Sequence, residues 1–335
     1  MTRKRVNLAL QGGGAHGAFT WGVLDAFLED GRLDIAAISG TSAGAMNAVV
    51  LADALRRGGP EAARAELAHF WRSVSLDGDL GDTQRALFDA LLGIWTPFGP
   101  PARWVGNAAS YFSPAQLNPL DINPLRDAIR REIDFPALRA SEGPQLFIAA
   151  TNVWTGKVRV FRRGELTIDM VMASACLPLV FRAVTIEGEP YWDGGYMGNP
   201  VLFPFFYQTG CEDVVLVQIN PIERRDTPRT VPEIEARLNE ITFNSSLLQE
   251  FRAIDFVARL IDAGALDPAR YKKARMHLVR DERLDGFGAA TKMKADWDFF
   301  QELCELGRQA ARRFLNENFD AIGVRGTLDL RAQFA

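Results

Sequence analysis

The sequence has few cysteines, no excess of positive charge and no long apolar run, and each shortage excludes a class of protein. Its three cysteines, Cys176, Cys211 and Cys304, are far apart, so they suggest neither a disulfide framework nor a zinc site. We expect reduced thiols in a cytoplasmic protein. The formal net charge is −4 and the arginines are scattered, so nucleic acid is not an expected partner.

Long hydrophobic segments are also missing. No stretch approaches the roughly 20 apolar residues that span a bilayer. The basic start Arg3-Lys4-Arg5 is followed by an apolar run, 6–10, that is too short for the core of a secretory signal. Any membrane contact is therefore expected to be peripheral. The 335 residues are 47% hydrophobic and 24% charged, an ordinary globular composition that can bury a large core.

What the sequence does contain is an alternation of strand and helix patterns. Buried strands are predicted at 6–10, 35–38, 145–150, 158–161, 214–219 and 275–279, and long helical segments at 233–263 and 294–316. Shorter helices are predicted after Gly17, at 61–71 and from Asn123-Pro124 to about Ile133. This alternation predicts an α/β fold, a three-layer sandwich whose mostly parallel central sheet is covered by helices on both faces.

The pentapeptide Gly40-Thr41-Ser42-Ala43-Gly44 lies between the apolar run 35–38 and a small-residue segment with helical spacing. This pattern predicts a nucleophile elbow, in which a strand turns sharply into a helix and exposes a serine hydroxyl at the helix N-terminus. Ser42 is the candidate nucleophile, with Gly40 and Gly44 giving the backbone room. The alternative from these five residues alone is a turn that only connects two elements.

A glycine-rich loop, Gly12-Gly13-Gly14-Ala15-His16-Gly17, follows the first predicted strand and allows two interpretations. The spacing of Gly12, Gly14 and Gly17 matches the dinucleotide-binding fingerprint, but the next strand lacks an acidic residue at its end to hold a ribose. The other interpretation is an anion-binding nest of backbone N–H groups, which serves as an oxyanion hole in acyl transfer.

Two further segments stand out. Asp193-Gly194-Gly195 follows a short aromatic run and can bring a carboxylate close to another loop, although Asp-Gly is also a common turn.

The segment 77–119 is rich in aromatics, proline and glycine with weak periodicity, which suggests a cap or lid inserted into the fold. We expect its residues 88–112, with Trp95, Phe98 and Trp104, to make transient contact with a membrane surface. The alternative is that these rings fill the core between the cap and the sheet.

Together these motifs resemble the patatin-like phospholipase family over roughly residues 6–220. The glycine loop resembles the family's oxyanion loop, the pentapeptide its elbow, and Asp193-Gly194-Gly195 the segment carrying its catalytic aspartate. Supporting segments at 150–156 and 173–181, including Ser174, are also similar. One departure is His16, where the family usually has arginine or lysine; a fixed positive charge beside the loop is therefore in doubt.

The resemblance implies a patatin-like fold and a Ser42-Asp193 dyad that hydrolyses lipid acyl esters through an acyl-enzyme, with no metal or other cofactor. It places the oxyanion hole at Gly12, Gly13, Gly14 and Ala43, supported by Gly40, Gly44, Gly194 and Gly195. A catalytic core at 1–225 and a mainly helical C-terminal part at 226–335, packed on the same domain, are expected. The expected location is the cytoplasm, peripheral at a membrane or lipid surface.

Alternatives stay open at this stage. Gly-x-Ser-x-Gly is also the α/β-hydrolase signature, and His277 follows Asp193 in the order of a Ser-Asp-His triad. Too few strands precede the elbow for that fold, so we favour the dyad. An acyltransferase, a hydrolase of another hydrophobic ester such as a storage polyester, a nucleotide-binding oxidoreductase and a non-catalytic lipid-binding protein are the other candidates.

Overall fold

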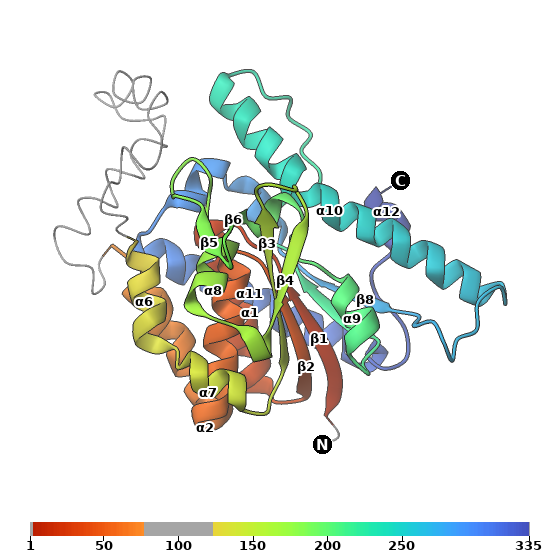
Figure 1. Ribbon diagram of the computed structural model, residues 1–335. Helices are drawn as coiled ribbons and strands as arrows, with labels where there is room; N and C mark the ends of the chain where they lie inside the picture. Colours follow the sequence, from red (N-terminus) through yellow and green to blue (C-terminus); the bar gives the residue numbers. More distant parts are fainter. Residues whose placement is uncertain (1–2, 77–122, 335) are drawn as a thin grey trace.

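The computed structural model describes residues 3–76 and 123–334. The predicted cap at 77–119, with the expected membrane-contact segment 88–112, lies outside these residues. Within them the chain forms one eight-stranded sheet in the order β5-β6-β3-β2-β1-β7-β8, with β4 paired to β3 (Figure 1). The strands are β1 Lys4–Leu10, β2 Leu33–Gly40, β3 Gln145–Asn152, β4 Val158–Arg162, β5 Val184–Ile186, β6 Glu189–Asp193, β7 Asp213–Val217 and β8 Arg275–Val279.

The sheet is mostly parallel, as the sequence predicts. Strands β3, β2, β1, β7 and β8 pair in parallel, whereas β4 and β6 pair antiparallel with β3, and β5 antiparallel with β6. Parallel neighbours place their carboxyl ends at one edge of the sheet, and Leu10 of β1 lies level with Gly40 of β2. The loops that follow these two strands, which carry the glycine loop and the elbow, therefore lie side by side.

Helices cover both faces of the sheet (Figure 1). Alternation along β1 shows the two sides, because Leu8 and Leu10 belong to one hydrophobic core and Ala9 to the other. On the Leu8 side lie α1 (Gly17–Asp30), α2 (Ala43–Ser73), α6 (Pro124–Glu132), α7 (Phe135–Ala140), α8 (Ile168–Ser174) and α11 (Trp297–Asn318). On the Ala9 side lie α9 (Phe203–Gln208), α10 (Val231–Asp262) and α12 (Leu330–Phe334). The predicted three-layer α/β sandwich is confirmed.

Local sequence signals mark several helix ends. Gly31 ends α1 with a left-handed φ of 71°, and the Asn123 side chain caps α6 by accepting a hydrogen bond from the N–H of Arg126. The break predicted before residue 61 is also present, since Gly58 and Gly59 are non-helical and divide α2 into two helical segments. The strand predicted to reach Ile219 ends earlier, at Val217, because the N–H groups of Ile219 and Asn220 bond to a side chain instead, as described below.

The C-terminal residues contribute to the same layers. Strand β8 extends the sheet beside β7, and α11 packs along α1. These two helices approach very closely: a Cβ on Gly22 would lie 1.9 Å from the carbonyl oxygen of Cys304, and one on Gly307 would lie 2.0 Å from that of Phe19. The division of the chain near residue 225 stays a prediction.

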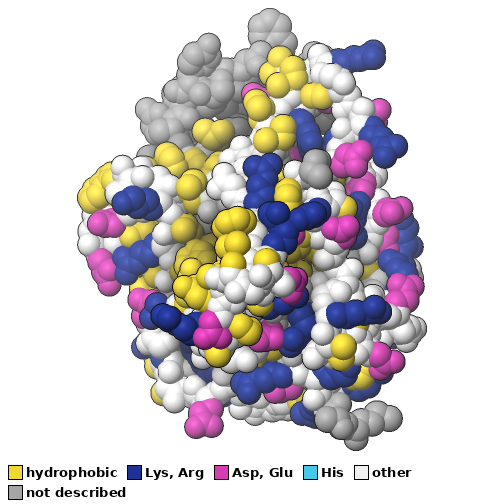
Figure 2. Space-filling model, turned by 90° about the vertical axis from the view of Figure 1, so that its right-hand side faces the viewer, with side chains coloured by type: hydrophobic (Ala, Val, Ile, Leu, Met, Phe, Trp, Pro, Cys, Tyr) yellow, Lys and Arg dark blue, Asp and Glu magenta, His cyan; other side chains and the backbone are white. Residues whose placement is uncertain are grey.

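The surface shows no separation of charge on the face drawn in Figure 2, where positive and negative side chains are interspersed between small groups of hydrophobic ones. None of the helices in the described ranges is both long and apolar enough to cross a membrane.

The contact between α1 and α11 gives a test of the packing. Gly307→Ala places a methyl group against the Phe19 carbonyl and should lower the free energy of unfolding by about 1–3 kcal/mol, measured by urea denaturation. Gly210→Ala is the matched control, because among the described residues no atom beyond the adjacent two lies within 4 Å of the added Cβ there. Equal stability of the two variants would contradict the close helix contact.

Candidate active site

Ser42 occupies the corner between β2 and α2. Its backbone has φ 55° and ψ −123°, a conformation that costs a non-glycine residue on the order of 1–3 kcal/mol and persists only when its surroundings enforce it. The Ser42 N–H donates to Ser174 Oγ at 3.0 Å, and Thr41 Oγ1 donates to the carbonyl of Gly198 at 2.7 Å. The side chain is largely buried, with 8% of the residue exposed. The geometry is that of a nucleophile elbow.

Glycines give the elbow its room, as predicted for Gly40 and Gly44. A Cβ on Gly44 would lie 2.3 Å from the carbonyl oxygen of Leu10, and one on Gly40 would lie 2.6 Å from that of Gly44. From the neighbouring loop, Gly12 approaches so closely that a Cβ there would be 2.6 Å from the Cβ of Ser42. Any side chain at these positions would force the elbow and the glycine loop apart.

Asp193 reaches the elbow from the other side of β3. It is the last residue of β6 and pairs with Ala150 of β3, which is itself the parallel neighbour of β2. The next residue, Gly194, lies so close to the elbow that a Cβ on it would be 3.0 Å from Thr41 Cγ2. The Gly195 N–H donates to Asp193 Oδ1 at 2.7 Å, and Phe243 of α10 packs against Gly195. The structure thus brings Ser42, Asp193 and their flanking glycines together.

The carboxyl group of Asp193 is completely buried, and this determines its acidity. Burial raises the pKa of Asp193 to about 7, opposed by the hydrogen bond from Gly195 and by the hydrogen-bonding influence of the Ser42 side chain. No partner in the described part of the chain meets hydrogen-bond geometry at Oδ2. One carboxyl oxygen is therefore oriented by the backbone, and the other has no hydrogen-bond partner among the described residues.

Among the four predicted oxyanion donors, Gly12 is already engaged. Its N–H donates to Asn199 Oδ1 at 2.6 Å. Gly14 and Ala43 each stand at the first position of a helical segment, where the N–H has no partner within the helix, and Gly13 is the residue before Gly14. In the described ranges no hydrogen bond from these three N–H groups is present. Gly13, Gly14 and Ala43 are thus the candidate donors that remain free.

A buried network of side-chain amides holds the glycine loop. Gln11 Oε1 accepts from the backbone N–H groups of Ile219 and Asn220, each at 2.9 Å. Asn220 Nδ2 donates to the Gly12 carbonyl at 2.7 Å, and Asn199 contacts the same residue from the other side. Sequence reasoning missed these amides, since a lone glutamine or asparagine carries no motif. Only the position of Gln11 directly before the glycines hinted at such a role.

His16, the departure from the family pattern, is buried and neutral. Its Nε2 pairs with Thr291 Oγ1 at 2.8 Å, and its ring lies 6.0 Å from that of Phe287 between centroids. Burial, with the positive charges of Lys292 and Arg224, lowers the pKa of His16 to about 3. His16 therefore cannot supply a positive charge to the loop near neutral pH.

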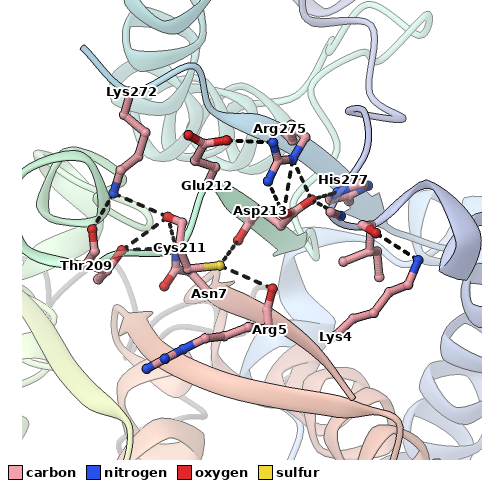
Figure 3. Close-up of polar contacts among 12 residues, drawn as sticks. Lys4, Arg5, Asn7, Thr209, Cys211, Glu212, Asp213, Lys272, Arg275 and His277 are labelled. Atoms are coloured by element: carbon pink, nitrogen blue, oxygen red, sulfur yellow. Dashed lines mark hydrogen bonds and ion pairs between the residues drawn. The ribbon is translucent and has the colours of Figure 1, made fainter. Parts of the chain in front are cut away.

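His277 makes its hydrogen bonds with Thr327 and Asp213, not with Ser42 or Asp193. It lies in the middle of β8 opposite Val215, with Nε2 paired to Asp213 Oδ1 at 3.1 Å and Nδ1 to Thr327 Oγ1 at 3.0 Å. Figure 3 shows this cluster, in which Arg275 also binds Asp213. Although burial opposes it, hydrogen bonds from His277 and Arg275 hold the pKa of Asp213 well below its usual range. Both ring nitrogens of His277 are thus used structurally.

Three further features of the chain are the remaining histidine, the cysteines and the arrangement of possible metal ligands. His69 lies on α2 with its Nε2 3.7 Å from Glu132, so none of the three histidines hydrogen-bonds to Ser42. The three cysteines are buried and form no disulfide with one another. Within the described ranges no group of three or more His, Cys, Asp or Glu side chains is arranged to hold a metal ion.

The buried carboxyl gives a prediction for stability. Because folding raises the pKa of Asp193 from 3.8 to about 7, its favourable contribution is complete at low pH and is lost as pH rises to the folded value. We expect the free energy of unfolding of the wild type, relative to Asp193→Asn, to fall by up to about 1.4 kcal/mol per pH unit from about pH 4 to 7. Denaturation by urea across this range measures the difference, in which the other buried acids, Glu132 and Glu250, cancel. Parallel pH dependences would contradict the buried, proton-binding carboxyl.

Comparisons with known proteins find a matching family model and similar solved structures. The family model described as patatin-like phospholipase matches residues 8–206. Solved structures similar to this chain include VipD from Legionella pneumophila, with 15% identity, a TM-score of 0.34, and coverage of 90% of this chain and 67% of that one. ExoU from the type III secretion system of Pseudomonas aeruginosa, solved with SpcU, has 16% identity, a TM-score of 0.35, and coverage of 93% and 53%. The chain thus spans about two thirds and about half of those proteins, and a comparison with curated sequences finds no match. The matched family model covers more than half of the length of this chain, so the chain belongs to the patatin-like phospholipase family.

Proposed function

We propose that this protein hydrolyses the acyl esters of lipids, as a phospholipase A or lysophospholipase does, with Ser42 as nucleophile and Asp193 as general base. The observation that carries the proposal is the pairing of a serine in a strained elbow with a fully buried carboxyl group whose pKa is close to 7. A base with that pKa is half-deprotonated near neutral pH and can both take and return a proton. Membership of the family supports the same chemistry.

The proposed reaction uses these groups in turn. Asp193 removes the proton from Ser42 Oγ as Oγ attacks the ester carbonyl carbon, and the N–H groups of Gly13, Gly14 and Ala43 stabilise the resulting oxyanion. Collapse of the tetrahedral intermediate breaks the bond to the alcohol oxygen, which takes the proton from Asp193. Water then attacks the acyl-serine and gives its proton to Asp193, and release of a fatty acid returns that proton to Ser42.

A covalent probe tests the dyad directly. A fluorophosphonate should label Ser42, and Ser42→Ala should lose both labelling and turnover. Asp193→Asn should lower the rate at least about 100-fold, the usual size of a general-base contribution. Products are identified by mass spectrometry on a panel of phospholipids, lysophospholipids, neutral glycerides and short esters, with and without an alcohol acceptor, which separates hydrolysis from acyl transfer.

His277→Gln is the matched control for this experiment, because it replaces a buried side chain whose hydrogen bonds go to Thr327 and Asp213 and not to Ser42 or Asp193. The folded variant should keep most of its activity. Near-complete inactivation of folded His277→Gln, with Asp193→Asn still active, would replace the dyad by a histidine-dependent mechanism.

We also propose that the first turns of α10 rest on the surface of the lipid substrate. Val231, Ile234, Leu238 and Ile241 recur at helical spacing on one face of this helix and are 67%, 42%, 57% and 50% exposed. This part of α10 projects beyond the sheet (Figure 1), and further along the helix Phe243 packs against the turn after Asp193. A lipid aggregate is the occupant that fits, because the buried Ser42 can act on a lipid only if the protein meets the surface from which that lipid comes.

Replacement of this apolar stripe separates surface contact from chemistry. Leu238→Ser with Ile241→Ser should reduce co-sedimentation with phosphatidylcholine vesicles and turnover on them about tenfold or more, because two apolar side chains no longer enter the interface. Hydrolysis of a soluble short-chain ester should not change. Val324→Ser, at a residue that is 74% exposed outside α10, is the control. Unchanged vesicle binding by the α10 variant would refute the contact.

A further inference from the structure

The glycine loop is covered by a segment from the far end of the chain. The short helical turn η5 (Ala289–Met293) lies against the turn η1 (Gly14–His16), so closely that a Cβ on Gly14 would be 2.2 Å from the carbonyl oxygen of Lys292. Gly14 also has a left-handed φ of 58°. The hydrogen bond between His16 and Thr291 fixes the same contact from the side chains. The loop and η5 therefore form one packed unit.

Lys292 places an ammonium group in the amide network of this unit. Its Nζ donates to Asn220 Oδ1 at 2.7 Å, and that oxygen would be 3.4 Å from a Cβ on Gly13. Asn220 Nδ2, on the other end of the amide, donates to the Gly12 carbonyl at 2.7 Å. One asparagine side chain thus connects the Lys292 ammonium to the loop that carries the candidate oxyanion donors.

The ammonium group of Lys292 has no close counter-ion in the part of the chain that the structure describes. Within the described ranges no carboxylate oxygen lies within 4 Å of Lys292 Nζ. The acid that acts on it electrostatically, Glu240, is already held by Arg224 at 2.7 Å and Arg237 at 3.1 Å. His16 is neutral. Lys292 is therefore the residue that brings net positive charge into direct contact with the amides holding the glycine loop.

We propose that Lys292 is a positioning residue for acyl transfer, which orients the Asn220 amide against the glycine loop and adds positive potential there as the oxyanion forms. This inference rests on the proposed function. The orientation follows from hydrogen-bond roles: an ammonium has only donors, so it selects the oxygen of the asparagine amide and turns the NH₂ toward the Gly12 carbonyl. The charge acts without moving, which is the condition for electrostatic stabilisation of a transition state.

Substitution at Lys292 tests the role. Lys292→Met keeps an unbranched side chain as far as Cε but removes the ammonium, and it should lower kcat on a soluble ester about tenfold or more while changing KM less than about threefold. Lys292→Arg should restore part of the loss. Lys294→Met is the matched control, since Lys294 is an exposed lysine two positions away with its Nζ 3.9 Å from Asp296, and its kcat should equal that of the wild type.

The pH profile provides a readout that loss of packing would not change. Burial lowers the pKa of Lys292 to about 8, with Glu240 of α10 opposing this and Arg224 contributing to it, while His16 of η1 faces the lysine uncharged. Wild-type kcat should therefore rise as Asp193 loses its proton near pH 7 and decline as Lys292 loses its own near pH 8. Lys292→Arg should remain active to higher pH, because a guanidinium stays protonated.

Each outcome decides the inference. A wild-type protein that is neither labelled at Ser42 nor active overturns the proposed function and this inference together. An active wild type with an unchanged kcat in folded Lys292→Met overturns only the role of Lys292. If thermal unfolding shows that Lys292→Met does not fold, Lys292→Arg decides: an alkaline decline at the same pH as in the wild type overturns the role, and a decline shifted upward supports it.

Discussion

The close approach of three backbone segments around Ser42 is the constraint on which the site depends. The loop after β1, the elbow after β2 and the turn after β6 meet at distances that leave no room for a Cβ on Gly12, Gly44 or Gly194. A φ of 55° is an unfavourable backbone conformation for serine. Ser42 keeps it because the three packed segments leave no room for another backbone conformation. The order of strands β6-β3-β2-β1 is what places the three loops side by side.

This crowding also produces the chemistry of the site. Water is excluded from Asp193, and nothing with a positive charge contacts its carboxyl group in the described structure, so burial raises its pKa to about 7. An aspartate in water, with a pKa near 3.9, is a poor acceptor for a serine proton. The nearby Tyr196 has a pKa raised to about 12 by burial and by Asp193, so it stays neutral. The carboxyl group alone therefore titrates near neutral pH at the turn after β6.

The local parts of this arrangement could be predicted from sequence, and the long-range parts could not. Short stretches of sequence predict the strands, the helices, the helix start at Asn123 and the elbow around Ser42. In each of them, hydrophobic periodicity, a capping side chain or closely spaced glycines determine the local structure. The pairing of Gln11 with Ile219 and Asn220 joins residues more than 200 positions apart, and it ends β7 two residues before its predicted end. Likewise, no local pattern shows that the Gly12 N–H is already bonded to Asn199.

The neutral histidine of the glycine loop, His16, depends on the C-terminal turn η5 for its hydrogen bond. The buried imidazole of His16 packs against the rings of Phe287 and Phe299 and requires a polar partner, which Thr291 provides from 275 positions away. The turn η5 carries both this threonine and Lys292. The same turn therefore covers the glycine loop and brings the Lys292 ammonium group to Asn220, which holds that loop. Because η5 packs against both η1 and α10, the glycine loop attains its final environment only once this distant turn lies against it.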